Sequence, residues 1–407
     1  MKILWLAPFP HPLDTAAHPV PWVGTLANLL KQVPGVELTV LNWTPRLTAP
    51  AEEFDRDGMH FIYLKTPPVR QDILTLYRPR IAIVRSYLQA HAHEYDLLHL
   101  HGSELQLPAM TAGLKVPMLL SVQGIVSVYA RHVPNTFSML KFLWTLAGLY
   151  ERRYLPTVHH FLCRTDWDKA HTARLSPGCT IYHNWETLRP EFFAADLPKP
   201  PPPLRPQILF VGGSQAIKGF KEALQTFDRI RQAEDLRLVI VGRLGDDEVQ
   251  AVVQRYRLRN ISPGSVECRR FQTAAELAEL CRESFCLLHP SYIDNSPNSV
   301  CEAQLMGLPV VATDVGGVGS LITEGETGLL APLDPAALAR QVLRLHHDPA
   351  LHRRIAAQAQ ALARQRHDPA VIVQRTLDAY RAVLAAARPP ARATAPVLAA
   401  QSPALSS

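Results

Sequence analysis

The chain has 407 residues, 47% of them hydrophobic, which is enough for two domains with separate cores. Its net charge of +6 and pI near 9.0 suit an anionic ligand or an anionic membrane surface. The sequence has no dense basic run with interleaved aromatic residues, so we expect no nucleic acid as a partner. No apolar run approaches the ~20 residues of a membrane span, and residues 1–8 are too short for a signal sequence.

The six cysteines contain no CxxC pair and lie mostly in apolar strand or helix patterns, so they do not indicate a metal site. Reduced thiols of a cytoplasmic protein are the expectation, and we predict no essential metal or other cofactor. The expected protein is either soluble or peripheral on the inner face of the membrane.

The N-terminal half alternates short apolar runs with helical patterns, which predicts a parallel, doubly wound α/β sheet. Its expected strands are residues 2–6, 37–41, 61–64, 96–100, 118–122 and 160–163. Residues 128–155 combine basic side chains with apolar and aromatic ones, a composition typical of a helix that lies on a membrane. The alternative is a domain helix that packs its apolar side inward.

A proline-rich segment, residues 198–206, predicts a stiff linker between an N-terminal domain (1–197) and a C-terminal domain (207–370). Strands near Gln207, Leu238, Phe285, Val310 and Gly328 predict a second Rossmann-like sheet. A terminal helix is expected over 371–387. The tail 388–407, rich in Pro, Ala and Ser, is expected to be disordered.

Two loops of the C-terminal half carry candidate binding residues. Gly212 and Gly213 follow a buried strand, and Lys218 precedes a helical pattern. A lysine at a helix N-terminus opposes the helix dipole, so an anion such as a nucleotide diphosphate is expected beside it. Further along, Ser296 is the expected N-cap of a helix that has Pro297 at its first position.

That second helix should end at Gly307 and lead into a buried strand over 310–312. Ligands of parallel sheets bind beyond the carboxyl ends of the strands, which places Asp294 and the helix N-terminus at the ligand crevice. Glu302 follows two turns further along. Spacing alone leaves open whether the two acids are solvated helix charges.

The segment 294–317 resembles family 4 of the glycosyltransferases, whose members adopt the GT-B fold of two Rossmann-like domains that face a central cleft. In that family an acid, seven residues and a glutamate precede an AMxxGxPVVAT strand and a DVGG loop. Here Asp294, Glu302, and residues 303–317 occupy those places. Residues 324–330 resemble the family's next strand, and residues 212–219 resemble its phosphate loop.

The resemblance implies retaining transfer of a hexose-type sugar from a nucleotide-diphosphate donor to a glycan or lipid-linked acceptor, in cell-surface polysaccharide synthesis. Asp294 would hold sugar hydroxyls and Lys218 the diphosphate, and these two are the predicted catalytic residues. Glu302 would hold the ribose, with N–H groups around Asn295, Ser296 and Asn298 on the phosphate or sugar. No nucleophile is required, because the departing diphosphate can take the acceptor's proton.

By the same resemblance, Gly24, His101 and Gln123 are candidates for the acceptor cleft, and the terminal helix returns to the N-terminal domain. The chain also departs from the family. Gly213 stands where an arginine is common, and Arg243 or the pair Arg269 and Arg270 could replace its charge. Gln123 stands where many relatives have histidine, and Asp294 where glutamate is usual.

Three other functions are weighed against the glycosyltransferase. A catalytically silent sugar-nucleotide-binding protein would account for Gly213 and Gln123, and a GT-B epimerase would need no acceptor. An NAD-dependent oxidoreductase is disfavoured, since no GxGxxG follows the first strand.

Overall fold

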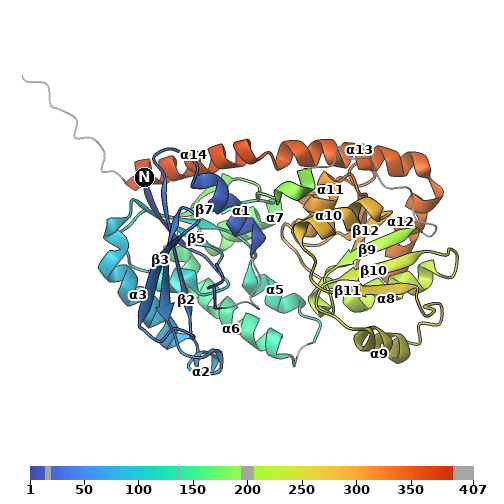
Figure 1. Ribbon diagram of the computed structural model, residues 1–407, viewed down its shortest axis with the longest axis horizontal. Coiled ribbons are helices and arrows are strands. Elements are labelled where there is room, and N and C mark those ends of the chain that lie inside the picture. Colours follow the sequence, from blue (N-terminus) through green and yellow to red (C-terminus); the bar gives the residue numbers. More distant parts are fainter. Residues whose placement is uncertain (14–19, 136, 194–205, 388–407) are drawn as a thin grey trace, which may run out of the picture.

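Two α/β domains lie side by side in the computed structural model, which describes residues 1–13, 20–135, 137–193 and 206–387. Helices α13 (Pro349–Arg366) and α14 (Pro369–Ala387) run along one side of both domains (Figure 1). The prediction of two Rossmann-like parallel-sheet domains is confirmed.

The N-terminal sheet has the strand order β3-β4-β2-β1-β5-β6-β7-β8, and its neighbours are parallel except for the β3–β4 pair. The strands are β1 (Lys2–Leu6), β2 (Glu37–Thr44), β3 (Ala51–Arg56), β4 (Met59–Lys65), β5 (Leu97–His101), β6 (Met118–Ser121), β7 (His160–Cys163) and β8 (Thr180–His183). The two edge strands, β3 and β8, were not predicted. Both are largely or partly exposed, so neither shows the apolar run of a buried strand.

The C-terminal sheet is entirely parallel over its described strands, with the order β11-β10-β9-β12-β13-β14. The strands are β9 (Gln207–Val211), β10 (Arg237–Val241), β11 (Val266–Arg269), β12 (Cys286–His289), β13 (Val310–Thr313) and β14 (Leu329–Ala331). Strands β9 and β12 are neighbours although 70 residues of chain or more separate them. The loops that follow them therefore emerge together at one edge of the sheet.

Helices cover both faces of each sheet and bury one apolar cluster on each face. The N-terminal helices are α1 (Pro21–Leu30), α2 (Val69–Leu74), α3 (Arg78–His91), α4 (Leu107–Thr111), α5 (Val126–His132), α6 (Met139–Tyr154) and α7 (Asp166–Leu175). The C-terminal helices are α8 (Phe220–Ile230), α9 (Asp246–Tyr256), α10 (Ala274–Glu283), α11 (Asn298–Leu305) and α12 (Pro335–His347).

The terminal helix α14 packs on the N-terminal domain through a buried polar network. The hydroxyl of Tyr380 accepts a hydrogen bond from Trp5 Nε1 (3.1 Å) and lies 2.7 Å from His99 Nδ1. His99 Nε2 lies 2.7 Å from Ser121 Oγ. Burial lowers the pKa of His99 to about 3, so this histidine is a neutral structural group.

The two places where the described chain passes between the domains lie next to each other. The segment after β8 contributes Leu188 and Phe192 to the core of the C-terminal domain, although both fall in the range 1–197 predicted for the N-terminal one. At the junction of α13 and α14, His367 Nδ1 lies 2.8 Å from the carbonyl oxygen of Glu186. Residues 198–205 of the predicted linker and the predicted tail 388–407 lie outside the described residues.

Candidate active site

The loop after β9 is fixed by close backbone contacts with the loops after β10 and β12. Gly213 has a φ of 54°, and a Cβ there would lie 2.8 Å from the backbone N and O of Arg243. A side chain at position 213 would therefore collide with that backbone. On the other side, Tyr292 N donates to Ile217 O (2.9 Å), and a Cβ on Gly219 would overlap the Pro290 carbonyl oxygen. These contacts bring the end of the loop to the segment that contains Asp294.

Lys218 and Asp294 form an ion pair at the carboxyl ends of β9 and β12. Lys218 Nζ lies 2.6 Å from Asp294 Oδ2, and His289 Nε2 lies 3.3 Å from the same oxygen. Burial raises the pKa of Asp294, but the Lys218 charge and the His289 hydrogen bond outweigh it and hold this pKa well below its usual range. Asp294 is therefore an ionised acceptor for hydroxyl groups, and it neutralises part of the Lys218 charge.

Asn295 joins the two domains. Its Oδ1 accepts a hydrogen bond from Thr165 Oγ1 (2.5 Å), and its Nδ2 donates to Asp168 Oδ2 (2.8 Å) and Gln123 O (3.3 Å). All three partners belong to the N-terminal domain. The residue next to Asp294 thus fixes that carboxylate at the domain interface, a role for its side chain that the sequence did not reveal.

Helix α11 begins one residue later than expected, so the prediction that Ser296 is its N-cap was wrong. Pro297 occupies the cap position with the extended ψ of 119°, and the helix runs from Asn298 without a side-chain cap. The Ser296 hydroxyl is instead buried beside the Cys301 thiol. The predicted end is confirmed, since Leu308 N donates to Ala303 O (2.9 Å) across Gly307. Val300 N donates to Pro297 O (3.0 Å), and the N–H groups of Asn298 and Ser299 at the uncapped start of the helix stay available to a ligand.

Glu302 is held by an arginine that the sequence did not single out. Arg189, from the segment after β8, places Nε at 3.0 Å and Nη2 at 2.8 Å from Glu302 Oε1. Burial raises the pKa of Glu302 to about 7, and the Arg189 charge offsets only part of this effect. Both donors reach the same oxygen, so Arg189 fixes the position of the carboxylate.

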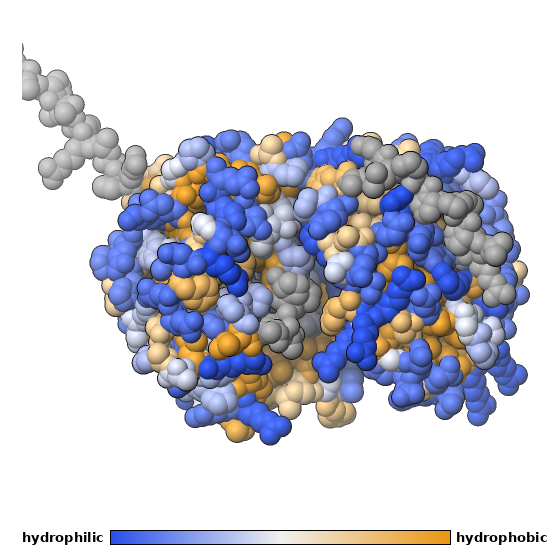
Figure 2. All heavy atoms as spheres, in the orientation of Figure 1, coloured by the Kyte–Doolittle hydropathy of each residue, from blue (hydrophilic) through white to orange (hydrophobic). Residues whose placement is uncertain are grey.

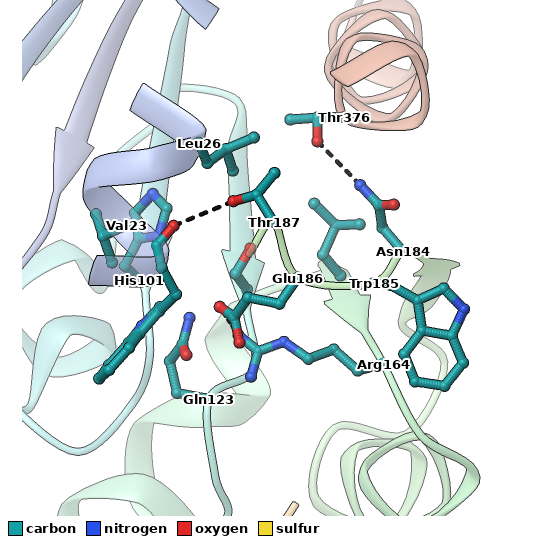
Figure 3. Close-up of a pocket in the computed structure, with 13 residues that line it drawn as sticks. Val23, Leu26, His101, Gln123, Arg164, Asn184, Trp185, Glu186, Thr187 and Thr376 are labelled. Carbon is teal, nitrogen blue, oxygen red and sulfur yellow. Dashed lines mark hydrogen bonds and ion pairs between the residues drawn. The ribbon is translucent and has the colours of Figure 1, made fainter. Parts of the chain in front are cut away.

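On the N-terminal side, a pocket brings His101 and Gln123 together with an ion pair between Arg164 and Glu186 (Figure 3). Arg164 Nη2 lies 2.7 Å from Glu186 Oε1, and burial raises the pKa of Glu186 to about 7 despite this partner. Burial, with His99 and Arg164 nearby, lowers the pKa of His101 well below its usual value, so its ring is neutral.

The α1 wall of this pocket is formed by Trp22, Val23 and Leu26. Gly24 lies between them in sequence on the same helix, with open space where a Cβ would be. The structure thus brings His101 and Gln123 into one pocket and places Gly24 on the helix beside it.

A family model described as Glycosyl transferases group 1 matches residues 205–348. The described C-terminal domain is therefore similar to the group 1 glycosyltransferases. A D-inositol 3-phosphate glycosyltransferase from Arthrobacter sp. is 27% identical over 393 residues, covering 89% of each chain. Its namesake from Streptomyces bingchenggensis is 33% identical over 174 residues, which span 40% of this chain and only 38% of that relative.

Solved GT-B structures share the fold of this protein. Sucrose-phosphate synthase from Thermosynechococcus elongatus is 19% identical and superposes with a TM-score of 0.73 over 95% of this chain and 99% of that one. Anabaena HepE in complex with UDP-glucose is 17% identical with a TM-score of 0.64, covering 94% and 100%. The prediction of the family and of the GT-B fold is therefore confirmed.

Glu104 is a further buried carboxylate near the N-terminal strand ends that the sequence did not reveal. Its carboxylate lies against Gly102 and Gly124, at the ends of β5 and β6. Burial raises its pKa to about 7, and the nearby Glu151 adds to the effect. Glu104 follows His101, Gly102 and Ser103 directly beyond a strand, and this position could have marked it as a candidate site residue. Among the described residues, no three His, Cys, Asp or Glu side chains gather so that they could hold a metal ion.

The raised pKa of Glu302 predicts a pH-dependent donor affinity. If the carboxylate form binds the donor, its fraction rises from about one tenth at pH 6 to about nine tenths at pH 8, because the pKa is about 7. The dissociation constant of the nucleoside diphosphate should therefore fall about tenfold over this range. Isothermal titration of nucleoside diphosphate binding between pH 6 and 8 measures it.

The variant Glu302→Gln should remove this pH dependence. Burial also raises the pKa values of Glu186 and Glu104 to about 7, and both residues remain in the variant. Any pH dependence that the variant retains would therefore come from groups other than Glu302. Arg189 and Glu191 are the charged groups that bear on Glu302. An unchanged pH profile in Glu302→Gln would exclude Glu302 as its source.

Proposed function

We propose that this protein is a retaining glycosyltransferase that moves a hexose-type sugar from a nucleotide-diphosphate donor to a glycan or lipid-linked acceptor. The observation that carries the proposal is the Lys218–Asp294 pair at 2.6 Å, where the carboxyl ends of β9 and β12 meet the N-terminal domain. A cation and an ionised acceptor side by side suit the diphosphate and the hydroxyls of one ligand.

Each group of the site has a role in this proposal. Lys218 binds the diphosphate, Asp294 accepts hydrogen bonds from sugar hydroxyls, and Glu302 accepts them from the ribose. The uncapped N-terminus of α11 stabilises negative charge on the phosphate or the sugar. These groups position the donor and stabilise its departing diphosphate, which then takes the proton of the acceptor. The charge is supplied by side chains and backbone, so no essential metal is required.

The names of the relatives support a nucleotide-sugar donor and widen the choice of acceptor. HepE is described in complex with UDP-glucose, and an alpha-maltose-1-phosphate synthase from Mycobacterium tuberculosis is 29% identical over 195 residues. Sugar phosphates therefore belong in the acceptor test beside glycans and lipid-linked sugars. The proposal also includes the place and pathway of the reaction. The protein would act in the cytoplasm, in the synthesis of polysaccharide for the cell surface.

The test is a donor screen with UDP-, GDP- and ADP-sugars, each with glycan, lipid-linked and sugar-phosphate acceptors, with and without EDTA. We expect transfer with one donor, an anomeric configuration in the product equal to that of the donor, and no effect of EDTA. Tight nucleotide-sugar binding without turnover on any acceptor would favour the silent binding protein. Conversion of the donor without acceptor to an epimeric sugar would favour the epimerase.

Arg243 is predicted to supply the second positive charge at the diphosphate. Its backbone packs against Gly213, and its side chain is exposed at the end of β10, next to the strand that leads to Lys218. Arg243→Ala should weaken nucleoside diphosphate binding about tenfold, the loss of one charged hydrogen bond, and leave nucleoside monophosphate binding nearly unchanged. Arg255→Ala on the exposed side of α9 is the matched control. Equal losses for both nucleotides would exclude this role.

A further inference from the structure

Large apolar side chains are exposed together at one end of the N-terminal domain. Phe137 is 99% exposed and Met139 66%, at the start of α6, and Leu74 is 82% exposed at the end of α2. We call this surface the docking face and define it by Val69, Leu74, Leu76, Phe137, Met139, Phe142 and Leu149, all of which are exposed. Exposed apolar residues in such a cluster mark an interaction surface.

The sequence of α6 explains why its apolar stripe points outward. Met139, Phe142, Leu146 and Leu149 recur at intervals of three and four residues and so share one side of the helix. The other side packs closely against α5. Gly148 lies on that side, and a Cβ there would be 2.8 Å from Ser127 Cα. The stripe is therefore not the side that packs into the domain.

The two helices form one continuous face. The Tyr150 hydroxyl of α6 donates to the carbonyl oxygen of Leu76, just beyond α2, at 2.6 Å. Both helices lie in the lower part of the N-terminal domain in Figure 1, and hydrophobic residues are exposed among hydrophilic ones at that end in Figure 2. The apolar residues of α2 and α6 thus share one flank of the molecule.

The charge around the docking face is of one sign. Residues 69–91 and 126–154 contain two acids, Asp72 and Glu151, and both are buried. Asp72 pairs with Arg80 (3.3 Å), and Glu151 accepts hydrogen bonds from Ser103 Oγ and from the first N–H groups of α5. The exposed charged residues of these segments are cations, among them Arg70, Arg78, Arg131, Arg152 and Arg153. An apolar stripe inside a cationic rim is complementary to an anionic bilayer surface.

We propose that the docking face binds the surface of an anionic membrane. Helix α5, which backs α6, begins directly after Gln123 and Gly124 of the acceptor side, and its Tyr129 lies beside Asp294. A membrane held on α6 therefore lies next to the cleft, where a lipid-linked acceptor can enter. This last step rests on the proposed function, whereas membrane binding does not.

Vesicle flotation of the full chain tests the proposal, with phosphatidylcholine alone and mixed with phosphatidylglycerol. We expect binding to the mixed vesicles that weakens at high salt, and little binding to phosphatidylcholine alone. The double variant Leu74→Ser and Phe142→Ser should lower the partition coefficient about tenfold or more. Phe271→Ser, at an exposed apolar residue of the C-terminal domain, is the control and should bind like the original protein.

No binding of the original chain to either vesicle, or equal binding of the double variant, would overturn the proposal. A dimer in solution that the double variant abolishes, without vesicle binding, would assign the face to a second copy of the chain and also overturn it. Thermal unfolding and nucleoside diphosphate binding, both expected to be unchanged, check that the variants are folded. Vesicle binding without any sugar transfer would refute the proposed function and still support membrane binding by the docking face.

Discussion

Replacing Lys218 with alanine is expected to reduce sugar transfer about 10²- to 10³-fold, the effect of losing one preorganised charge at the site of the departing group. Two losses combine. The diphosphate loses the cation that lies at the carboxyl end of β9, and the buried carboxylate of Asp294 loses its lysine partner and keeps His289 and the Asn295 N–H. Steady-state kinetics with the donor found in the screen measures the effect as kcat/KM.

Two comparisons separate this role from a structural one. Lys218→Arg keeps the charge but replaces the compact ammonium group that lies 2.6 Å from Asp294, so we expect partial activity. Lys221→Ala removes a nearby lysine of α8 that pairs with Glu222, and it should leave kcat/KM within about twofold. A Lys218→Ala variant that keeps more than about a tenth of the activity would contradict the assigned role.

A double-mutant cycle shows whether the pair acts as one unit. If Lys218 and Asp294 serve one ligand, Lys218→Ala combined with Asp294→Asn should lose little more activity than either single variant. Additive losses would mean that the two side chains act separately.

Tyr380→Ala should destabilise the N-terminal domain by about 3–5 kcal/mol, the range for truncating a buried aromatic side chain. Tyr380 is fully buried, and its hydroxyl is the partner of both Trp5 and His99. Truncation opens a cavity between α14 and the sheet and leaves two buried polar groups unsatisfied. Urea unfolding, followed by hydrogen exchange in β1 and β5, measures the loss where it should occur.

The companion variants divide this loss between packing and hydrogen bonding. Tyr380→Phe keeps the ring and should cost about 1–3 kcal/mol for the unpaired polar groups. Val371→Ala, at an exposed position near the start of α14, should cost less than about 0.5 kcal/mol. If Tyr380→Ala unfolds at the same urea concentration as the original chain, α14 does not stabilise the N-terminal domain.

The sequence predicted the features that depend on local pattern. The strands expected over 2–6 and 160–163 have the bounds of β1 and β7, because buried parallel strands show as apolar runs. The places of Lys218 and Asp294 beyond two strand ends followed from the same kind of pattern. That the two side chains meet depends on β9 and β12 being neighbours in the sheet, which the pattern does not contain.

The features that could not be predicted depend on distant partners. Arg189 reaches Glu302 across 113 positions, and Asn295 reaches Asp168 across 127, so no local pattern contains either pair. The Ser296 prediction failed by a single residue. A serine before a helical pattern is a good N-cap on average. Here Pro297 has the extended conformation of the cap residue, so the helix starts one residue later than predicted.

The contact between His367 and the Glu186 carbonyl has a mechanical consequence. The chain crosses between the domains at these two places, and the 2.8 Å hydrogen bond pins the crossings to each other. Two connections that lie together favour rotation of the domains about that point over sliding of one domain past the other. Any such rotation that moves the domains apart would have to break the hydrogen bonds of Asn295 with Thr165 and Asp168.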